Sequence, residues 1–91
     1  MNRLFVQAPG LLLRRTLDSL LVLPLHLDTI CELERSSLEI WEVCSEPIGA
    51  DQIARTLGER YGASRDEVTD DVQAGLDRMV ALGLLVEVPS A

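Results

Sequence analysis

Few residues in this sequence could support catalysis or bind a metal ion. The chain has one histidine, His26, and two cysteines, Cys31 and Cys44. Imidazole and thiolate groups bind zinc, but this spacing matches no standard zinc pattern and a fourth ligand is missing. Ser–His or Cys–His catalysis would need a second group at a recognisable spacing, and the sequence offers none. We therefore expect a structural histidine and two apolar core thiols, with no catalytic residue, no metal and no cofactor.

Carboxylates are the other groups that could do chemistry. The pairs Asp70-Asp71 and Glu32/Glu34 could form a catalytic or metal-binding set, although a solvated face is the simpler interpretation. The chain has 15 acidic and 8 basic residues, which gives a net charge of −7. Because nucleic-acid affinity depends on clustered positive charge, we expect no nucleic-acid partner. The negative charge favours a partner that carries some positive charge.

Length and composition predict one domain over residues 1–91, with a core from about residue 9 to residue 88. Hydrophobic residues make up 47% of the chain and aromatic residues only 3%, so the core must be mainly aliphatic. The apolar stretch 4–13 is interrupted by Gln7, Pro9 and Gly10, and it is too broken for a signal peptide or a membrane span. We therefore expect no membrane partner. Two cysteines make no disulfide framework, so we also expect a cytoplasmic protein.

The first half of the chain predicts three strands. Residues 11–16 and 20–25 are apolar runs on either side of the polar pair Asp18-Ser19, which is typical of a hairpin. Pro24 should end the second strand, because proline cannot donate to a sheet. Residues 26–34 alternate in polarity, which predicts a third strand with one buried face. Ile30 is the exception, an apolar residue on the polar side.

The second half predicts three helices. Ser36 with Glu39 has the spacing of a capping box, and the helix that follows should end near Ser45, before Pro47. A second helix should run from an N-cap at Gly49 to a left-handed cap at Gly62. The third should start from a capping box of Ser64 and Glu67 and stop at Gly83, with a short strand or packed tail over residues 84–88.

These elements predict an α+β fold of winged helix-turn-helix type, with a three-stranded antiparallel sheet followed by three helices. One stripe of the third helix should be buried. It consists of Val68, Val72, Gly75, Leu76 and Met79. A glycine inside a helix costs about 0.5 to 1 kcal/mol relative to alanine, so Gly75 should allow a close approach, either of a ligand or of another core element.

Three stretches carry a resemblance to a known family. They are Leu33-Glu34-Arg35-Ser36 leading into Ile40-Trp41, residues 48–62, and residues 68–85. In this order they resemble the PqqD-like family of RiPP recognition elements, from about Pro9 to Val88. Two positions depart from the family pattern. Glu34 stands where the family often has Asn or Asp, and Ser45-Glu46 stands where the family often has Asp-Gly. These departures concern the subgroup to which the chain would be assigned within the family. The Ile40-Trp41 pair, with no attached enzyme, resembles the free-standing recognition proteins of lasso-peptide pathways.

The resemblance implies a non-catalytic domain that binds the leader segment of a ribosomally made precursor peptide. The leader would add as an antiparallel strand on the third strand and lie in the groove between that strand and the third helix. A separate maturation enzyme, such as a leader peptidase, would be the second partner. The residues expected to contact the leader are Asp28, Thr29, Ile30, Cys31, Glu32, Leu33, Val68, Asp71, Val72, Gly75, Leu76 and Met79. Ile30 could equally be a singly exposed aliphatic residue.

Two other classes of function fit such a fold. A generic protein-interaction module of the winged-helix type is the main alternative, and an encoded precursor peptide beside the gene would discriminate against it. A DNA-binding regulator would use the third helix for recognition. That helix has five acidic residues between Arg65 and Arg78, which would repel phosphate.

Overall fold

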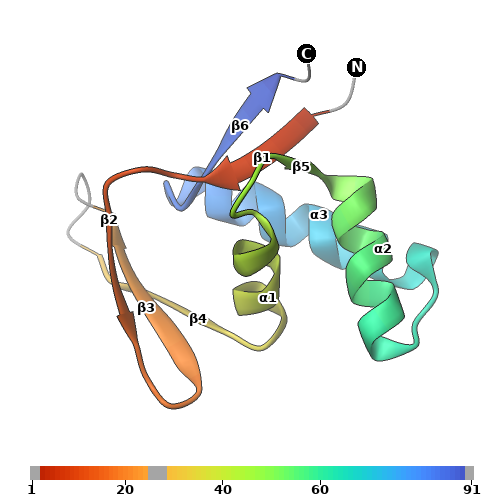
Figure 1. The fold of residues 1–91 in the computed structure, drawn as a ribbon, viewed down its shortest axis with the longest axis horizontal. Helices are drawn as coiled ribbons and strands as arrows, with labels where there is room; N and C mark the ends of the chain where they lie inside the picture. The colour runs from red at the N-terminus through yellow and green to blue at the C-terminus, as the bar shows by residue number, and fades with distance from the viewer. Residues whose placement is uncertain (1–2, 25–28, 90–91) are drawn as a thin grey trace.

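The computed structural model describes residues 3–24 and 29–89, apart from the side chain of Arg65. That part of the chain forms six strands and three helices, and Figure 1 shows how they are arranged. The elements in chain order are β1 (Arg3–Gln7), β2 (Leu11–Arg15), β3 (Ser19–Pro24), β4 (Cys31–Glu34), α1 (Ser36–Val43), β5 (Ile48–Gly49), α2 (Ala50–Tyr61), α3 (Arg65–Ala81) and β6 (Leu85–Pro89). The predicted α+β class, with a three-stranded antiparallel sheet before three helices, is confirmed.

The predicted sheet has the strand order β2-β3-β4. β2 and β3 form the expected hairpin, which ends with Leu11 opposite Pro24. β4 pairs with β3 through Leu20 opposite Leu33 and Val22 opposite Cys31. The third strand is shorter than predicted, because Thr29 and Ile30 precede it without strand pairing. The earlier part of the predicted strand, residues 26–28, lies outside the described residues.

A second antiparallel sheet, in the order β5-β1-β6, was not predicted. It joins the two ends of the described chain, with Arg3 opposite Pro89 and Gln7 opposite Leu85. Of the two alternatives predicted for residues 84–88, a short strand or a packed tail, the strand is confirmed as β6. Its partner is the N-terminal stretch, which sequence analysis interpreted only as a broken apolar run. Phe5, at 1% exposure, extends the core upstream of residue 9.

Local sequence explains where α3 begins and where α2 ends. Ser64 and Glu67 form the predicted capping box at the start of α3, and Gly62 ends α2 with a left-handed φ of 65°. The capping box predicted at Ser36 is wrong. α1 begins at Ser36 itself after Arg35, whose φ is 54°, and no side chain caps it. Instead, the Ser37 hydroxyl donates to the Glu34 carbonyl at 2.8 Å and accepts from the Glu34 N–H at 3.1 Å.

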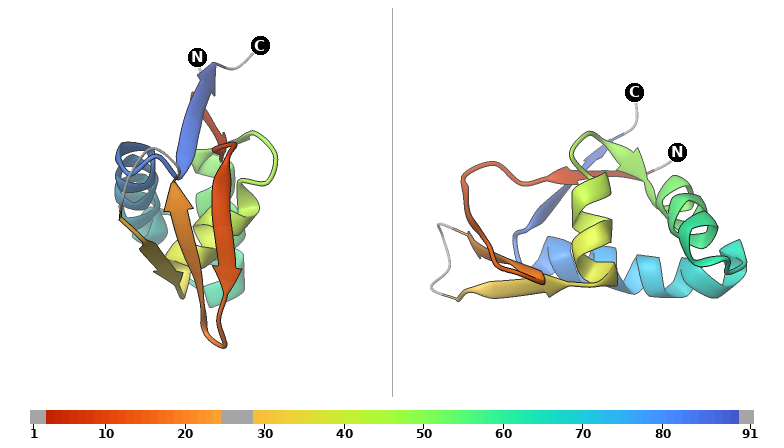
Figure 2. Two further views of the ribbon diagram at one scale, coloured as in Figure 1. Left: turned by 90° about the vertical axis from the view of Figure 1, so that its left-hand side faces the viewer. Right: turned by 60° about the horizontal axis from the view of Figure 1, so that its bottom comes forward.

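The helices pack behind one face of the β2-β3-β4 sheet, as the left view of Figure 2 shows. Leu20, Val22 and Leu33 point from that sheet into the core. The core is mainly aliphatic, as predicted, and the aromatic side chains in it are Phe5 and Trp41. The indole N–H of Trp41 donates to the Leu84 carbonyl at 3.3 Å, which ties α1 to the segment before β6. This packing holds α3 beside the edge strand β4.

Candidate peptide-binding groove

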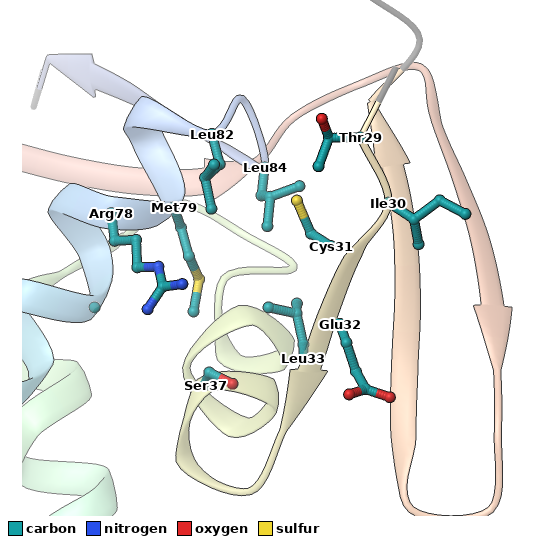
Figure 3. A pocket seen from close by; sticks show the side chains of 11 residues that line it. Thr29, Ile30, Cys31, Glu32, Leu33, Ser37, Arg78, Met79, Leu82 and Leu84 are labelled. Atoms are coloured by element: carbon teal, nitrogen blue, oxygen red, sulfur yellow. The ribbon is translucent and has the colours of Figure 1, made fainter. Parts of the chain in front are cut away.

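A groove of about 390 Å³ separates β4 from the C-terminal half of α3 (Figure 3). One wall comes from β4 and the two residues before it, and the other from α3 and the turn that follows. The lining residues are Thr29, Ile30, Cys31, Glu32, Leu33, Ser37, Gly75, Arg78, Met79, Leu82 and Leu84. The fold therefore brings an edge strand and a helix face together around one hollow.

The edge of β4 that borders this groove is open. Within the described residues, β4 pairs only with β3, and no strand lies on its other side. In an antiparallel pair, alternate residues direct their N–H and C=O groups away from the partner strand. β4 thus presents main-chain donors and acceptors to any extended segment that enters the groove.

The groove has an apolar floor and a polar rim. Leu33, Met79 and Leu84 are buried at its base, while Cys31 and Leu82 are half-buried. Polar side chains in the lining come from Thr29, Glu32, Ser37 and Arg78. An apolar floor with a few polar groups at its margin is the usual composition of a ligand-binding cleft.

Part of the residue set predicted from the sequence lines this groove. From the strand side these are Thr29, Ile30, Cys31, Glu32 and Leu33, and from the helix side Gly75 and Met79. Sequence analysis missed Ser37, Arg78, Leu82 and Leu84. Arg78 and Leu82 follow Gly75 at intervals of three and seven residues, so the helical period could have identified them. Ser37 and Leu84 reach the groove through tertiary packing, for which the sequence has no local signal.

The remaining predicted residues that the structure describes lie elsewhere. Leu76 is 0% exposed and belongs to the core, so it offers no surface to a peptide in this conformation. Asp28 lies outside the described residues. Val68, Asp71 and Val72 line a separate hollow of about 150 Å³ nearer the start of α3. The rest of its lining is Ser36, Ile40, Leu57 and Tyr61.

Ile30 and Gly75 were given two interpretations each. Figure 3 shows the Ile30 side chain turned away from α3, and it is 61% exposed. It also lines a shallow hollow of about 230 Å³ on the outer sheet face, with Leu12, Leu13, Arg14, Leu21 and Leu23. At Gly75 a Cβ atom would lie 3.1 Å from Cδ1 of Ile40, so the glycine lets α1 and α3 approach closely. Gly75 also lines the groove, so a role toward a ligand stays a prediction.

Reactive groups are few in the described chain. Cys31 and Cys44 are free thiols, and burial raises the pKa of Cys44 to about 11. Among the described residues, no three His, Cys, Asp or Glu side chains gather as a metal-binding group. His26 lies outside them. No helix in the described part of the chain combines the length and apolar character needed to cross a membrane.

A small α+β domain with an open edge strand beside a helix-lined groove has the architecture of domains that bind peptides by strand addition. The family model of coenzyme PQQ synthesis protein D (PqqD) matches residues 21–85. Since that match covers well over half of the chain, the chain belongs to the PqqD family, and the resemblance is confirmed. Family members are non-catalytic chaperones that bind a precursor peptide and partner a modifying enzyme. Neither the curated proteins nor the solved structures contained a match.

Proposed function

We propose that this chain binds the leader segment of a ribosomally made precursor peptide and delivers it to a separate maturation enzyme. The leader adds as an antiparallel strand to the open edge of β4 and lies in the groove against α3. The observation that carries this proposal is the groove itself, in which unpaired β4 backbone borders a cleft with an apolar floor of Leu33, Met79 and Leu84. Membership of the PqqD family supports it.

Strand addition explains how so small a groove can hold a peptide. Main-chain hydrogen bonds to β4 supply affinity that does not depend on sequence, and side chains that enter the cleft supply selectivity. In an extended peptide every second side chain points to the same face. Alternate leader residues therefore enter the groove, and the others point toward the outer face of the sheet.

The role we propose for the domain is to present the precursor peptide to its enzyme. Binding the leader holds the rest of the precursor near the enzyme and raises its effective concentration there without any chemistry by the domain. We place the chain with the recognition proteins of lasso-peptide pathways. The support is the Ile40-Trp41 pair, whose side chains are both buried in α1. A leader peptidase is then the expected enzyme partner, in a cytoplasm that keeps Cys31 and Cys44 reduced.

Titration of the ¹⁵N-labelled domain with a synthetic leader, taken from a short precursor encoded beside it, tests this proposal by NMR. Amide shifts should concentrate in residues 29–34 and 75–84. The leader sequence in scrambled order is the matched control and should leave these amides unchanged. An unresponsive spectrum at high leader concentration would contradict leader binding and favour a generic interaction module. Shifts confined to the outer sheet face would contradict the strand-addition mode.

A further inference from the structure

We propose that Arg78 selects peptides that carry an aspartate or glutamate in the segment added to β4. The inference rests on the proposed function and specifies the class of peptide that the groove accepts. Arg78 is the only cation among the described residues that line the groove. Its side chain is exposed, and its guanidinium forms no hydrogen bond or ion pair with the described residues.

Three other arginines of the described chain have carboxylate partners. Arg3 pairs with Glu87 at 2.6 Å, and Arg60 approaches Glu39 at 3.4 Å. Arg15 lies 3.8 Å from Glu42. The chain has a net charge of −7, so carboxylates are plentiful. An arginine beside the groove that pairs with no carboxylate of the described chain is therefore available to a carboxylate of the ligand.

Two of the other polar side chains of the groove, Glu32 and Ser37, already have partners. The Glu32 carboxylate accepts a hydrogen bond from the Ser19 hydroxyl at 3.2 Å, on the sheet. The Ser37 hydroxyl is held by the backbone of Glu34. Arg78 is thus the charged group in the lining that is left for a ligand. Figure 3 shows its guanidinium on the β4 side of α3, close to Met79.

The chemistry of guanidinium defines the ligand. Two of its five N–H donors can form parallel hydrogen bonds to the two oxygens of a carboxylate. Such charge-assisted hydrogen bonds are about twice as strong as neutral ones. Met79, Leu33 and Leu84 form the apolar floor next to Arg78. Since side chains on one face of an extended peptide are two positions apart, the preferred motif has an acidic residue two positions from an apolar residue.

A carboxylate could come from a side chain or from the end of a peptide. We assign the side chain, because a leader continues into the rest of its precursor and has no terminus at the groove. The tests therefore use peptides whose C-terminus is amidated or joined to a constant linker. A parallel series with a free C-terminus separates the two sources, and preferential binding of the free terminus over the amidated one would overturn the assignment to a side chain.

Selection from a library of short random peptides displayed on a constant C-terminal linker is the first experiment. The baits are the wild-type domain, Arg78→Gln, Arg78→Glu and, as a charge-matched control, Arg55→Gln on α2. Wild type and Arg55→Gln should enrich an acidic residue two positions from an apolar one. Arg78→Gln should lose the acidic preference but keep the apolar one, and Arg78→Glu should favour Lys or Arg at the same position.

The outcomes separate this inference from the proposed function. Enriched peptides with no acidic preference on wild type, or with an unchanged preference on Arg78→Glu, would overturn the role of Arg78 and leave strand addition intact. A library from which wild type enriches no motif would contradict peptide binding itself. Amide spectra of all four baits test that each is folded, which we expect because Arg55 and Arg78 are both exposed.

Affinity of one selected peptide gives the magnitude. Replacing its glutamate by glutamine should weaken binding to wild type about two- to fivefold, a modest factor because the ion pair is partly exposed to solvent. The same replacement should have no effect on Arg78→Gln. An equal loss on both proteins would show that the glutamate contacts some other group.

Discussion

The two thiols occupy opposite environments, and their reactivity should report on the groove. Cys44 is 0% exposed, and burial raises its pKa to about 11, so it stays protonated and inaccessible near neutral pH. Cys31 is half-buried and lines the groove. We expect iodoacetamide to modify Cys31 in the native domain and Cys44 only after unfolding, as followed by intact mass.

The ligand dependence of that labelling is the informative part of the prediction. A leader strand on β4 would cover Cys31, so saturating leader should slow its modification. The Cys31→Ser variant is the control and should take up no label while folded. Labelling of Cys31 at the same rate with and without bound leader would argue against a strand on this edge.

Gly75 illustrates how one missing side chain sets the distance between two helices. Alanine favours a helix by about 0.5 to 1 kcal/mol over glycine, but its Cβ would lie 3.1 Å from Cδ1 of Ile40. We expect Gly75→Ala to change the free energy of unfolding by less than about 1 kcal/mol, because the two effects oppose each other. Urea denaturation measures this directly.

A double-mutant cycle separates the two effects. Ile40→Val removes the methyl group that the new Cβ would meet, at an expected cost of about 0.5 to 1.5 kcal/mol in the wild type. The same substitution should cost less in the Gly75→Ala background, since it also relieves the contact. Additive effects would show that α1 and α3 adjust freely and that Gly75 is not needed for their packing.

At the scale of elements, two helices with similar serine signals begin in different ways. Ser64 caps α3, and its loss in Ser64→Ala should lower the free energy of unfolding by about 1 kcal/mol. Ser36 makes no cap on α1, so Ser36→Ala should change stability by less than about 0.5 kcal/mol. Urea denaturation of both variants provides the measurement. Equal losses would contradict the uncapped start of α1.

The edge strand β4 allows a direct test of strand addition. Residues along it alternate in the direction of their N–H groups, so of Cys31 and Glu32 one donates toward β3 and the other toward the groove. Proline at the groove-facing position should abolish leader binding while the domain stays folded, as measured by calorimetric titration and amide spectra. Glu87→Ala, in the other sheet, is the control and should bind normally. Normal leader affinity for both proline variants would rule out main-chain pairing on β4.

Local signals in the sequence predicted elements well and their long-range pairing poorly. The hairpin β2–β3, the capping box at Ser64 and the left-handed Gly62 depend on neighbouring residues, and all three are confirmed. β1 was missed because its strand character depends on pairing with β6, some eighty residues later in the chain. The capping box predicted at Ser36 was wrong because the Ser37 hydroxyl bonds the backbone of Glu34, and nothing local favours that arrangement over a cap from Ser36.

The predicted site residues likewise fall into a part that the structure places in the groove and a part that it places elsewhere. The resemblance implied a site on the third strand and the third helix, and residues 29–33, Gly75 and Met79 of that set line the groove. Leu76 lies on the same stripe but points into the core, since a helix face wide enough to pack on a sheet has both a buried centre and an accessible margin. Periodicity alone cannot show which residues of the stripe are buried at its centre and which are accessible at its margin. The position of β4 determines which of them line the groove.

For the molecule as a whole, two electrostatic effects on a leader oppose each other. The net charge of −7 attracts a positively charged peptide from a distance, whereas Arg78 offers one local site for a carboxylate. A field from many charges acts mainly on the rate of association and is screened by salt, while contacts within the groove act mainly on dissociation. The best ligand should therefore be basic overall and place a single acidic residue in the groove.

Stopped-flow kinetics between about 50 and about 500 mM NaCl separate these contributions. Two peptides with the same groove segment, one with lysines and one with glutamates in the flanking residues, form the matched pair. The association rate constant should fall with salt for the basic peptide and rise for the acidic one, while both dissociation rate constants change little. If salt instead acts chiefly on the dissociation rate constants, and equally for both peptides, the net charge of the domain has no part in capturing the leader. Ion pairs inside the groove would then account for the salt dependence of binding.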